Sequence, residues 1–117
     1  MRITETDIIQ INKFMKINEI QITPIKPING LVAFASCLID DCLYLGSIGI
    51  LTRLNGGYRL TYPTKTVGNK QINIFHPINQ KAGKSIEKEI IKIYEEVMKK
   101  HDRHNQIGTA TEHIYHY

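Results

Sequence analysis

The sequence predicts an α+β fold: an antiparallel β-sheet meander of four to five strands followed by one long C-terminal helix. Segments with the period-two alternation of strands follow one another from residue 17 to residue 75, separated by turns rich in Gly, Asn and Asp. The hydrophobic period changes to 3.6 residues after Asn79, and it does so once. Because parallel strands need a crossover for each connection, a single helix favours antiparallel pairing.

Length and composition indicate one soluble domain. A chain of 117 residues can build a single modest core, and its 42% hydrophobic and 22% charged residues are ordinary for a globular protein. No apolar run approaches the roughly 18 residues of a membrane span, and the polar N-terminus shows no secretory signal. We therefore expect a cytoplasmic protein with no membrane partner, in which Cys37 and Cys42 are buried free thiols.

The first two strands surround the pair Asn29-Gly30. "INEIQIT" begins a strand that Pro24 and Pro27 are expected to close. "LVAFASCLI", residues 31–39, is apolar on both faces, as expected of a central strand or of one covered by a partner. Asp40-Asp41 then forms the turn into the returning strand "CLYLGSIGILT".

Glycines mark the next features. Gly46 and Gly49 inside the returning strand predict a bulge or a close backbone approach. "NGG", residues 55–57, predicts a tight turn, after which Tyr, Leu and Tyr alternate with polar residues through Tyr62. A second turn is expected at Gly68-Asn69, with "INIF", residues 72–75, as the last strand before Pro77.

The helix carries a narrow apolar stripe made of Ile86, Ile90, Ile93 and Val97, with Ile91, Tyr94 and Met98 on its shoulder. Asn79 and Ser85 are both possible N-caps, and Gly83 favours the later start. The helix is expected to end near His101. The sequence thus divides into an N-terminal extension (1–16), an α+β domain (17–101) and a flexible C-terminal tail (102–117).

Two catalytic or ligand-binding interpretations do not fit. "AGKS" resembles the end of a phosphate loop, but the position that needs the motif's first glycine is Ile78. Two H-x-x-H pairs, at residues 101/104 and 113/116, lie in or beside the polar tail, without the compact four-ligand framework of a zinc site. His76 is expected to be structural, forming a hydrogen bond at the corner between strand and helix. We expect no catalytic residue, metal or cofactor, and no enzyme activity.

Positive charge is concentrated in one part of the chain. Residues 43–84 contain six Lys or Arg residues and no Asp or Glu. On a helical wheel Lys81, Lys84, Lys88, Lys92 and Lys99 fall within an arc of about 80°, opposite the apolar stripe. Two interpretations remain open, a solvated helix face and a surface for a polyanion. Lysines suit phosphates as point charges, so binding would follow the backbone of a nucleic acid and select sequence only weakly.

The chain also resembles the SpoVG (stage V sporulation protein G, septation regulator) family. The resemblance lies in "NGLVAFASCLIDDCLYLGSIGI", the glycine turn, and "YRLTYPTKTVGNKQINIFHPINQKAGKSIEKEIIKIY", and it covers roughly residues 17–98. "YPTK" and "FHPIN", followed by "SIEKEIIKIY", are its most specific blocks. It implies a small α+β protein that forms a homodimer by joining sheets. It also implies a cytoplasmic bacterial regulator that binds DNA and RNA and is tied to septation and sporulation.

The resemblance adds one residue to the candidate site and shows two departures. Lys65 matches the lysine of the family's P-x-K block, whereas Thr66 stands where a basic residue often follows. Gly83 stands where an arginine is common, and Lys81 or Lys84 could replace it. The leading predicted phosphate contacts are Lys65, Lys81, Lys84, Lys88 and Lys92, followed by Arg59, Lys99 and Arg103.

The strand over residues 31–39 supports a homodimer independently, because one helix cannot cover both of its apolar faces. The sequence therefore predicts a homodimeric, nucleic-acid-binding regulator with DNA, RNA or both as partners. The alternative is a protein–protein interaction module that acts on a cell-division or regulatory partner without binding nucleic acid, through the dimer surface or the Tyr/His-rich tail.

Overall fold

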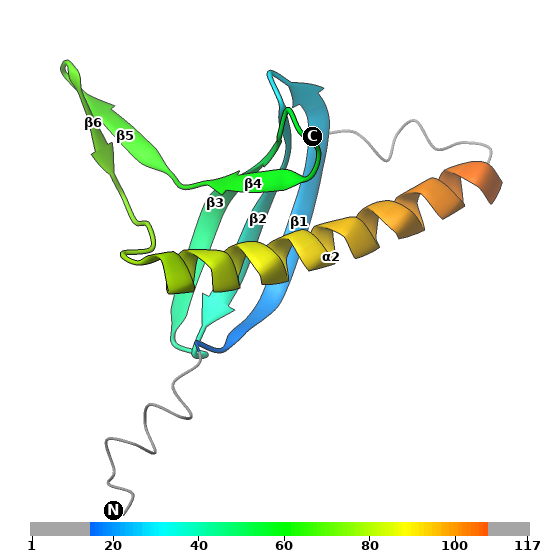
Figure 1. Cartoon of the computed structure of the whole chain (residues 1–117), viewed down its shortest axis with the longest axis horizontal. Helices are drawn as coiled ribbons and strands as arrows, with labels where there is room; N and C mark the ends of the chain where they lie inside the picture. The colour runs from blue at the N-terminus through cyan, green and yellow to red at the C-terminus, as the bar shows by residue number, and fades with distance from the viewer. Residues whose placement is uncertain (1–14, 108–117) are drawn as a thin grey trace, which may run out of the picture.

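One long helix crosses one face of a four-stranded sheet, and a second, small sheet projects from the same end of the molecule as the helix start (Figure 1). This computed structural model describes residues 15–107, with side chains described through His101. The elements in chain order are β1 (Ile17–Ile28), β2 (Leu31–Ile39), β3 (Leu43–Thr52), β4 (Tyr58–Thr61), β5 (Thr64–Val67), β6 (Lys70–Asn73) and α2 (Gln80–Ile107). The predicted α+β class is confirmed.

The large sheet is a simple meander with strand order β1-β2-β3-β4, and each strand pairs antiparallel with the next. Its first two turns are tight because the central residues of each have positive φ. These residues are Asn29 and Gly30 in one turn, and Asp40 and Asp41 in the other. Asn, Asp and Gly tolerate that conformation best, so the turn residues fix the hairpin register as the sequence predicts.

The first strand continues through both prolines instead of stopping at them. Pro24 pairs with Ala33, and the pairing extends as far as Ile28, which lies opposite Leu31. β1 is an edge strand, so half of its backbone donors have no partner strand. Proline has no backbone N–H, so at an edge position where that N–H would have no partner strand a proline costs no hydrogen bond. The prediction that the strand ends at its prolines was therefore wrong.

The last two strands do not continue the meander. β5 and β6 pair only with each other, over residues 64–73, and we call this hairpin the arm. Every residue of its two strands is exposed, and it extends away from the body (Figure 1). The last strand is Lys70–Asn73 and not the predicted "INIF", because Ile74 and Phe75 already belong to the connection to α2.

The core lies between α2 and the face of the large sheet that it covers. Its sheet side combines small residues on β2 with branched ones on β3, and its helix side is one line of side chains. The buried residues are Ala33, Ala35, Cys37, Ile39, Ile48, Ile50, Ile86, Ile90 and Tyr94. The backbone of α2 comes closest to the sheet at β1 and β4, and the small residues of β2 and the branched residues of β3 are buried in the same cluster as the helix residues. The buried apolar area is therefore concentrated along one seam between the helix and the sheet.

The buried line of α2 follows Ile86, Ile90 and Tyr94, with Ile93 and Val97 only partly buried. Tyr94 was expected on the shoulder of the stripe. Its ring instead meets that of Tyr58 edge to face, with the centroids 4.9 Å apart, and this contact rotates the buried line toward β4.

The helix begins at Gln80, earlier than predicted. Asn79 is its N-cap, because the Asn79 side-chain oxygen accepts a hydrogen bond from the Ala82 amide at 2.8 Å. Gly83 therefore lies inside the helix. The helix also continues past His101 to Ile107, so the first six residues of the predicted tail are helical. No helix within residues 15–107 has the length and apolar character that crossing a membrane requires.

Close approach explains Gly49, one of the two glycines within β3. A Cβ at Gly49 would lie 2.6 Å from Thr61 Cγ2 and 3.0 Å from Leu31 Cδ1, so the side chains of its neighbours occupy the space that a side chain would fill. The predicted bulge is also present: the β2–β3 register shifts between Ala35 and Cys37, and Ser47 has a φ of 59°.

The two cysteines have different environments. Cys37 is buried in the core, and burial raises the pKa of its thiol. Cys42 lies in the turn after β2 and is exposed, so the prediction that both thiols are buried was wrong for Cys42. Both are free thiols.

Ionic contacts hold the start of β1 to the β2–β3 turn. Lys16 Nζ lies 2.6 Å from Asp41 Oδ2, and the Lys16 amide donates to Asp40 Oδ1 at 2.8 Å. The hydrogen bonds from Lys16 and Asn18 lower the pKa of the Asp41 carboxyl. These groups are exposed, so the contacts position the chain more than they stabilise the fold.

The burial of the core residues predicts which helix side chain contributes most to the free energy of unfolding. Ile90 is fully buried, so Ile90→Ala should lower the free energy of unfolding by about 2–5 kcal/mol through lost burial and a residual cavity. Leu54→Ala removes a fully exposed leucine and should change it by less than about 0.5 kcal/mol. Urea unfolding followed by circular dichroism measures both, and equal midpoints for the two variants would contradict this assignment of the core.

Candidate functional site

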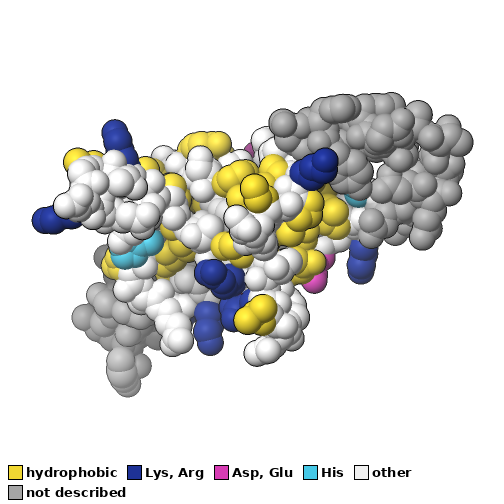
Figure 2. Space-filling view, turned by 90° about the horizontal axis from the view of Figure 1, so that it is seen from above, with side chains coloured by type: hydrophobic (Ala, Val, Ile, Leu, Met, Phe, Trp, Pro, Cys, Tyr) yellow, Lys and Arg dark blue, Asp and Glu magenta, His cyan; other side chains and the backbone are white. Residues whose placement is uncertain are grey.

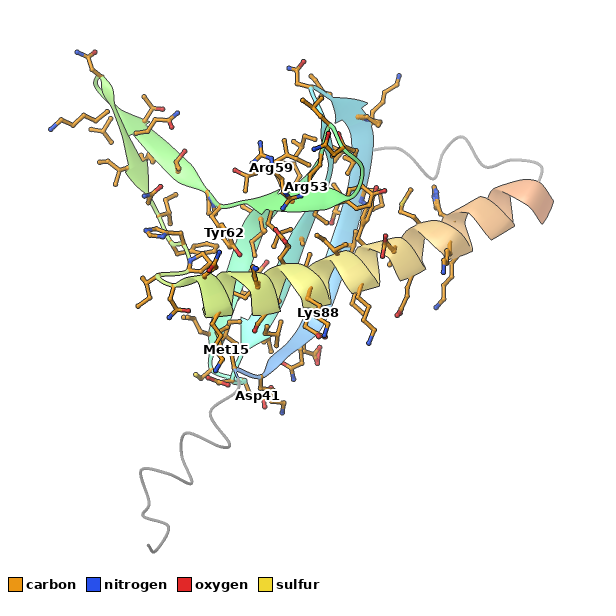
Figure 3. All side chains as sticks on the ribbon, viewed as in Figure 1. Met15, Asp41, Arg53, Arg59, Tyr62 and Lys88 are labelled. Carbon is orange, nitrogen blue, oxygen red and sulfur yellow. The ribbon has the colours of Figure 1, made fainter. Side chains whose placement is uncertain are left out.

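The predicted cationic residues of α2 form one exposed row, which we call the lysine stripe: Lys81, Lys84, Lys88, Lys92 and Lys99. It lies roughly opposite the buried line, because 3.6 residues per turn put Lys88 about 200° from Ile90. Lys88 projects outward from the helix (Figure 3). The packing of the apolar residues therefore determines the direction in which the amines point.

Most of these amines are not neutralised within the protein. Lys81 has a polar contact within the protein, but neither the Lys16–Asp41 nor the Arg53–Glu87 ion pair includes another lysine of α2. No hydrogen bond joins Lys84, Lys88, Lys92 or Lys99 to another described residue. These four ammonium groups are thus exposed and available to an external anion.

The arm carries two further lysines on a single face. Lys65 pairs with Ile72 and Val67 pairs with Lys70, so these four side chains share one face of the two-stranded ribbon. The other face carries only Thr, Gln and Asn side chains. Positively charged side chains, coloured dark blue, project from the arm at the left of Figure 2. Lys70 was not among the predicted contacts, and only the register of the hairpin shows that it accompanies Lys65.

One predicted contact lies away from the stripe, and the side chain of another lies outside the described residues. Arg59 lies between the partly buried Tyr58 and Leu60 on β4, so its side chain points to the opposite face of the sheet from α2. Arg103 lies within α2, but its side chain is outside the described residues. Arg59 therefore does not contribute to the same surface as the helix lysines.

An open pocket of about 260 Å³ lies where β4 passes the first turns of α2. It combines apolar walls with charged and amide side chains, and its lining residues are Arg53, Leu60, Tyr62, Gln80, Gly83, Lys84 and Glu87. Lys84 is the member of the lysine stripe that reaches it. Sequence reasoning missed Arg53, because nothing in "TRLNGG" indicates contact with a helix that begins 27 residues later.

Arg53 is held in place by its own turn. Its Nε donates to the carbonyl of Tyr58 at 2.9 Å, and its amide donates to the carbonyl of Gly57 at 3.0 Å. One terminal nitrogen lies 3.6 Å from a Glu87 carboxylate oxygen, which is an ion pair but too long for a hydrogen bond. Both side chains are partly exposed, so this ion pair adds little stability.

Tyr62 lies between β4 and the start of α2 (Figure 3), and its ring meets that of Phe75 edge to face. Its hydroxyl oxygen is buried, and no hydrogen-bond partner for it occurs among the described residues. Burial, followed by the nearby Cys37 and Glu87, raises the pKa of Tyr62 to about 12. At neutral pH this group is therefore a protonated donor with no acceptor.

His76 has the structural role that the sequence predicts. Its Nδ1 lies 2.9 Å from the carbonyl oxygen of Pro77, at the corner between the arm and α2. No group of three or more His, Cys, Asp or Glu side chains with the arrangement of a metal site occurs in the described part of the chain. The two H-x-x-H pairs lie mostly or wholly outside it.

The face of the large sheet away from α2, the rear face, carries an uncovered apolar patch on β2 and β3, beside polar residues of β1 and β4. Phe34 and Leu38 alternate with buried residues of β2, and Leu38 pairs with Tyr44 on β3. Phe34 is 39% exposed and Tyr44 is 67% exposed.

Comparison with known proteins gives one consistent result. The SpoVG family profile matches residues 15–96, which include every strand of the structure and more than half of α2. A protein of Treponema denticola that is named a septation protein, SpoVG, is 29% identical over 82 residues, covering 69% of this chain and 87% of that protein.

Proposed function

The chain belongs to the SpoVG family, and we propose that it is a cytoplasmic, homodimeric regulator that binds DNA or RNA mainly through phosphate contacts. The observation that carries this proposal is the row of exposed amines of Lys84, Lys88, Lys92 and Lys99, none of which forms an ion pair with a described residue. A septation or sporulation role is the form of regulation that the family suggests. The proposed activity is binding, with no catalytic step.

The stripe suits a polyanion better than a single small anion. Lys84, Lys88 and Lys92 follow one another at intervals of four residues, so their Cα atoms are spaced about 6 Å apart along the helix. Adjacent phosphates on one strand of a nucleic acid are separated by a comparable distance. Like charges this close repel one another slightly in the free protein, and a phosphate backbone would relieve that repulsion.

The arm supplies a second set of cations. Its face with Lys65 and Lys70 also carries Val67 and Ile72, and a two-stranded ribbon is narrow enough to follow a groove of a duplex. Lysine makes mainly point-charge contacts and lacks the rigid planar fork with which arginine forms bidentate pairs. We therefore expect affinity to depend strongly on salt and weakly on sequence.

We also propose that a second copy of the chain covers the rear face. In the single chain, Phe34 and Tyr44 leave aromatic surface in water, and the arm is a two-stranded hairpin that would be marginal alone. Both features are expected of a subunit whose partner completes the burial.

The rear face is also the observation that favours the alternative function. If it docks a cell-division or regulatory protein in place of a second copy, the protein would be an interaction module. That alternative predicts partner binding that survives high salt, and no binding to duplex DNA, single strands or structured RNA.

The first test is the salt dependence of binding. If each subunit contacts about three phosphates, a plot of log K against log salt concentration for the dimer should have a slope of about −5. Fluorescence anisotropy with labelled duplex, single-stranded and hairpin probes measures this slope. A slope near zero would mean that the lysine stripe serves solubility alone.

The second test reverses charge on the stripe. Lys88→Glu together with Lys92→Glu should weaken binding at least tenfold, and similarly for every probe sequence. The matched control combines Lys26→Glu with Lys100→Glu, which makes the same change in net charge at exposed positions outside the arc. Both double variants should keep the wild-type melting temperature. Equal losses of affinity in the two would show that only total charge matters.

The third test concerns the dimer. Wild type should sediment as a dimer at micromolar concentration, and Phe34→Arg should sediment as a folded monomer, because a buried interface cannot accommodate an unpaired guanidinium. Leu54→Arg is the control, since Leu54 is fully exposed in a turn. A monomeric wild type would contradict the homodimer, and a dimeric Phe34→Arg variant would place the interface away from the rear face.

A further inference from the structure

The pocket between β4 and α2 has more hydrogen-bond donors than acceptors. Arg53, Lys84, Gln80 and Tyr62 all bring N–H or O–H groups to it, whereas Glu87 is the one carboxylate among its lining residues. Its formal charge is positive, since two cations face one anion. A site of this composition is complementary to an oxyanion.

Arg53 is preorganised for such a ligand. Its backbone amide and Nε are both used within the β3–β4 turn, so the guanidinium is fixed while its terminal nitrogens remain open to the pocket. Glu87 is too far away, at 3.6 Å, to accept a hydrogen bond from it. A planar guanidinium held at one edge presents two parallel donors, the arrangement that binds phosphate in a bidentate manner.

The hydroxyl of Tyr62 gives a second, independent indication. Buried polar groups are nearly always hydrogen-bonded, so a buried hydroxyl without a partner needs an explanation. The raised pKa of Tyr62 keeps its proton in place. Because the hydroxyl oxygen is covered in the free protein, it can donate to a ligand once the side chains over it move as the ligand binds.

We propose that this pocket binds one phosphate group of a bound nucleic-acid strand, with Arg53 as the bidentate ligand, Lys84 as the second cation and the Tyr62 hydroxyl as a neutral donor. This inference rests on the proposed function and sharpens it. The lysine stripe attracts a backbone without fixing its position, whereas the pocket holds one phosphate in a defined place and so sets the register of the strand on the protein.

The experiment is a titration of the full chain, followed by amide NMR, with two small probes. Dimethyl phosphate represents a phosphate within a strand, and methyl phosphate represents a terminal one. Saturable shifts centred on residues 53, 62, 83 and 84 with dimethyl phosphate support the proposal. Shifts there with methyl phosphate alone would overturn it in favour of a terminal-phosphate site. Weak shifts spread along the stripe would overturn the pocket altogether.

Three substitutions separate the pocket from general charge. Arg53→Lys keeps the charge but loses the bidentate geometry, and Tyr62→Phe removes only the hydroxyl. Each should weaken dimethyl phosphate and oligonucleotide binding roughly tenfold. Glu87→Gln removes the competing carboxylate and should tighten binding roughly threefold. Lys100→Arg, outside the pocket and the stripe, is the control and should change nothing.

Stability supplies a readout that a purely structural role would not reproduce. If the Tyr62 hydroxyl has no partner in the free protein, Tyr62→Phe should melt at the wild-type temperature or above it, while binding less tightly. A clear fall in melting temperature would show that the hydroxyl already has a partner, and it would remove Tyr62 from the site.

Different results would disprove the phosphate pocket and the proposed function. Wild-type affinity for oligonucleotides in both Arg53→Lys and Tyr62→Phe would overturn the pocket and leave binding through the stripe intact. Absence of oligonucleotide binding by wild type, with dimethyl phosphate still bound in an Arg53-dependent way, would overturn the proposed function and leave a phosphate site of another use.

Discussion

The rest of the structure depends on a single seam, in which one helix packs on one face of a four-stranded sheet. Ile86 and Ile90 share one buried cluster with Ala33 and Ala35, and with only one helix in the described chain this cluster supplies nearly all of the core. The apolar residues of α2 can pack on the sheet in only one rotation of the helix about its axis. That rotation directs the lysines outward, so the packing of the apolar residues also determines the position of the positive charge.

The same constraint leaves surfaces unfinished. Because nothing in the described chain packs on the rear face, Phe34 and Tyr44 remain in water, and because the arm pairs only with itself, its apolar side chains do too. Small domains bury a low fraction of their surface, so such areas are costly unless another molecule covers them. A single chain buries too little apolar surface, and the proposed dimer would bury the apolar side chains that the single chain leaves exposed.

The cations of the molecule fall into two kinds. Those of the stripe sit on long, freely rotating stems and act through their summed field, which reaches about 8–10 Å in physiological salt. Arg53 is fixed by hydrogen bonds to its own turn and can act only at short range. In the proposed function, the lysines of the stripe attract the polyanion and Arg53 aligns it.

Local patterns predicted most of the fold and half of the candidate site. The turns at Asn29-Gly30 and Asp40-Asp41, the single helix and the lysine stripe follow from properties of neighbouring residues, so sequence alone suffices for them. The separate arm, the continuation of β1 through Pro24 and the pocket depend on which strands lie at an edge and on contacts between distant segments. Periodicity contains no information on either. Lys70 and Arg53 were missed for this reason, since their relevance arises from register and from tertiary contact.

The close packing around Gly49 gives this position an influence that its chemistry would not suggest. Its missing side chain lets Thr61 and Leu31 lie over the backbone of β3, and Thr61 belongs to the short strand that leads into Tyr62 and the arm. Even a single methyl group at Gly49 would require one of these neighbours to move. The absence of a side chain at Gly49 therefore helps to position β4 and the arm that follows it. A substitution there would shift the proposed phosphate contacts relative to one another without changing any of those residues.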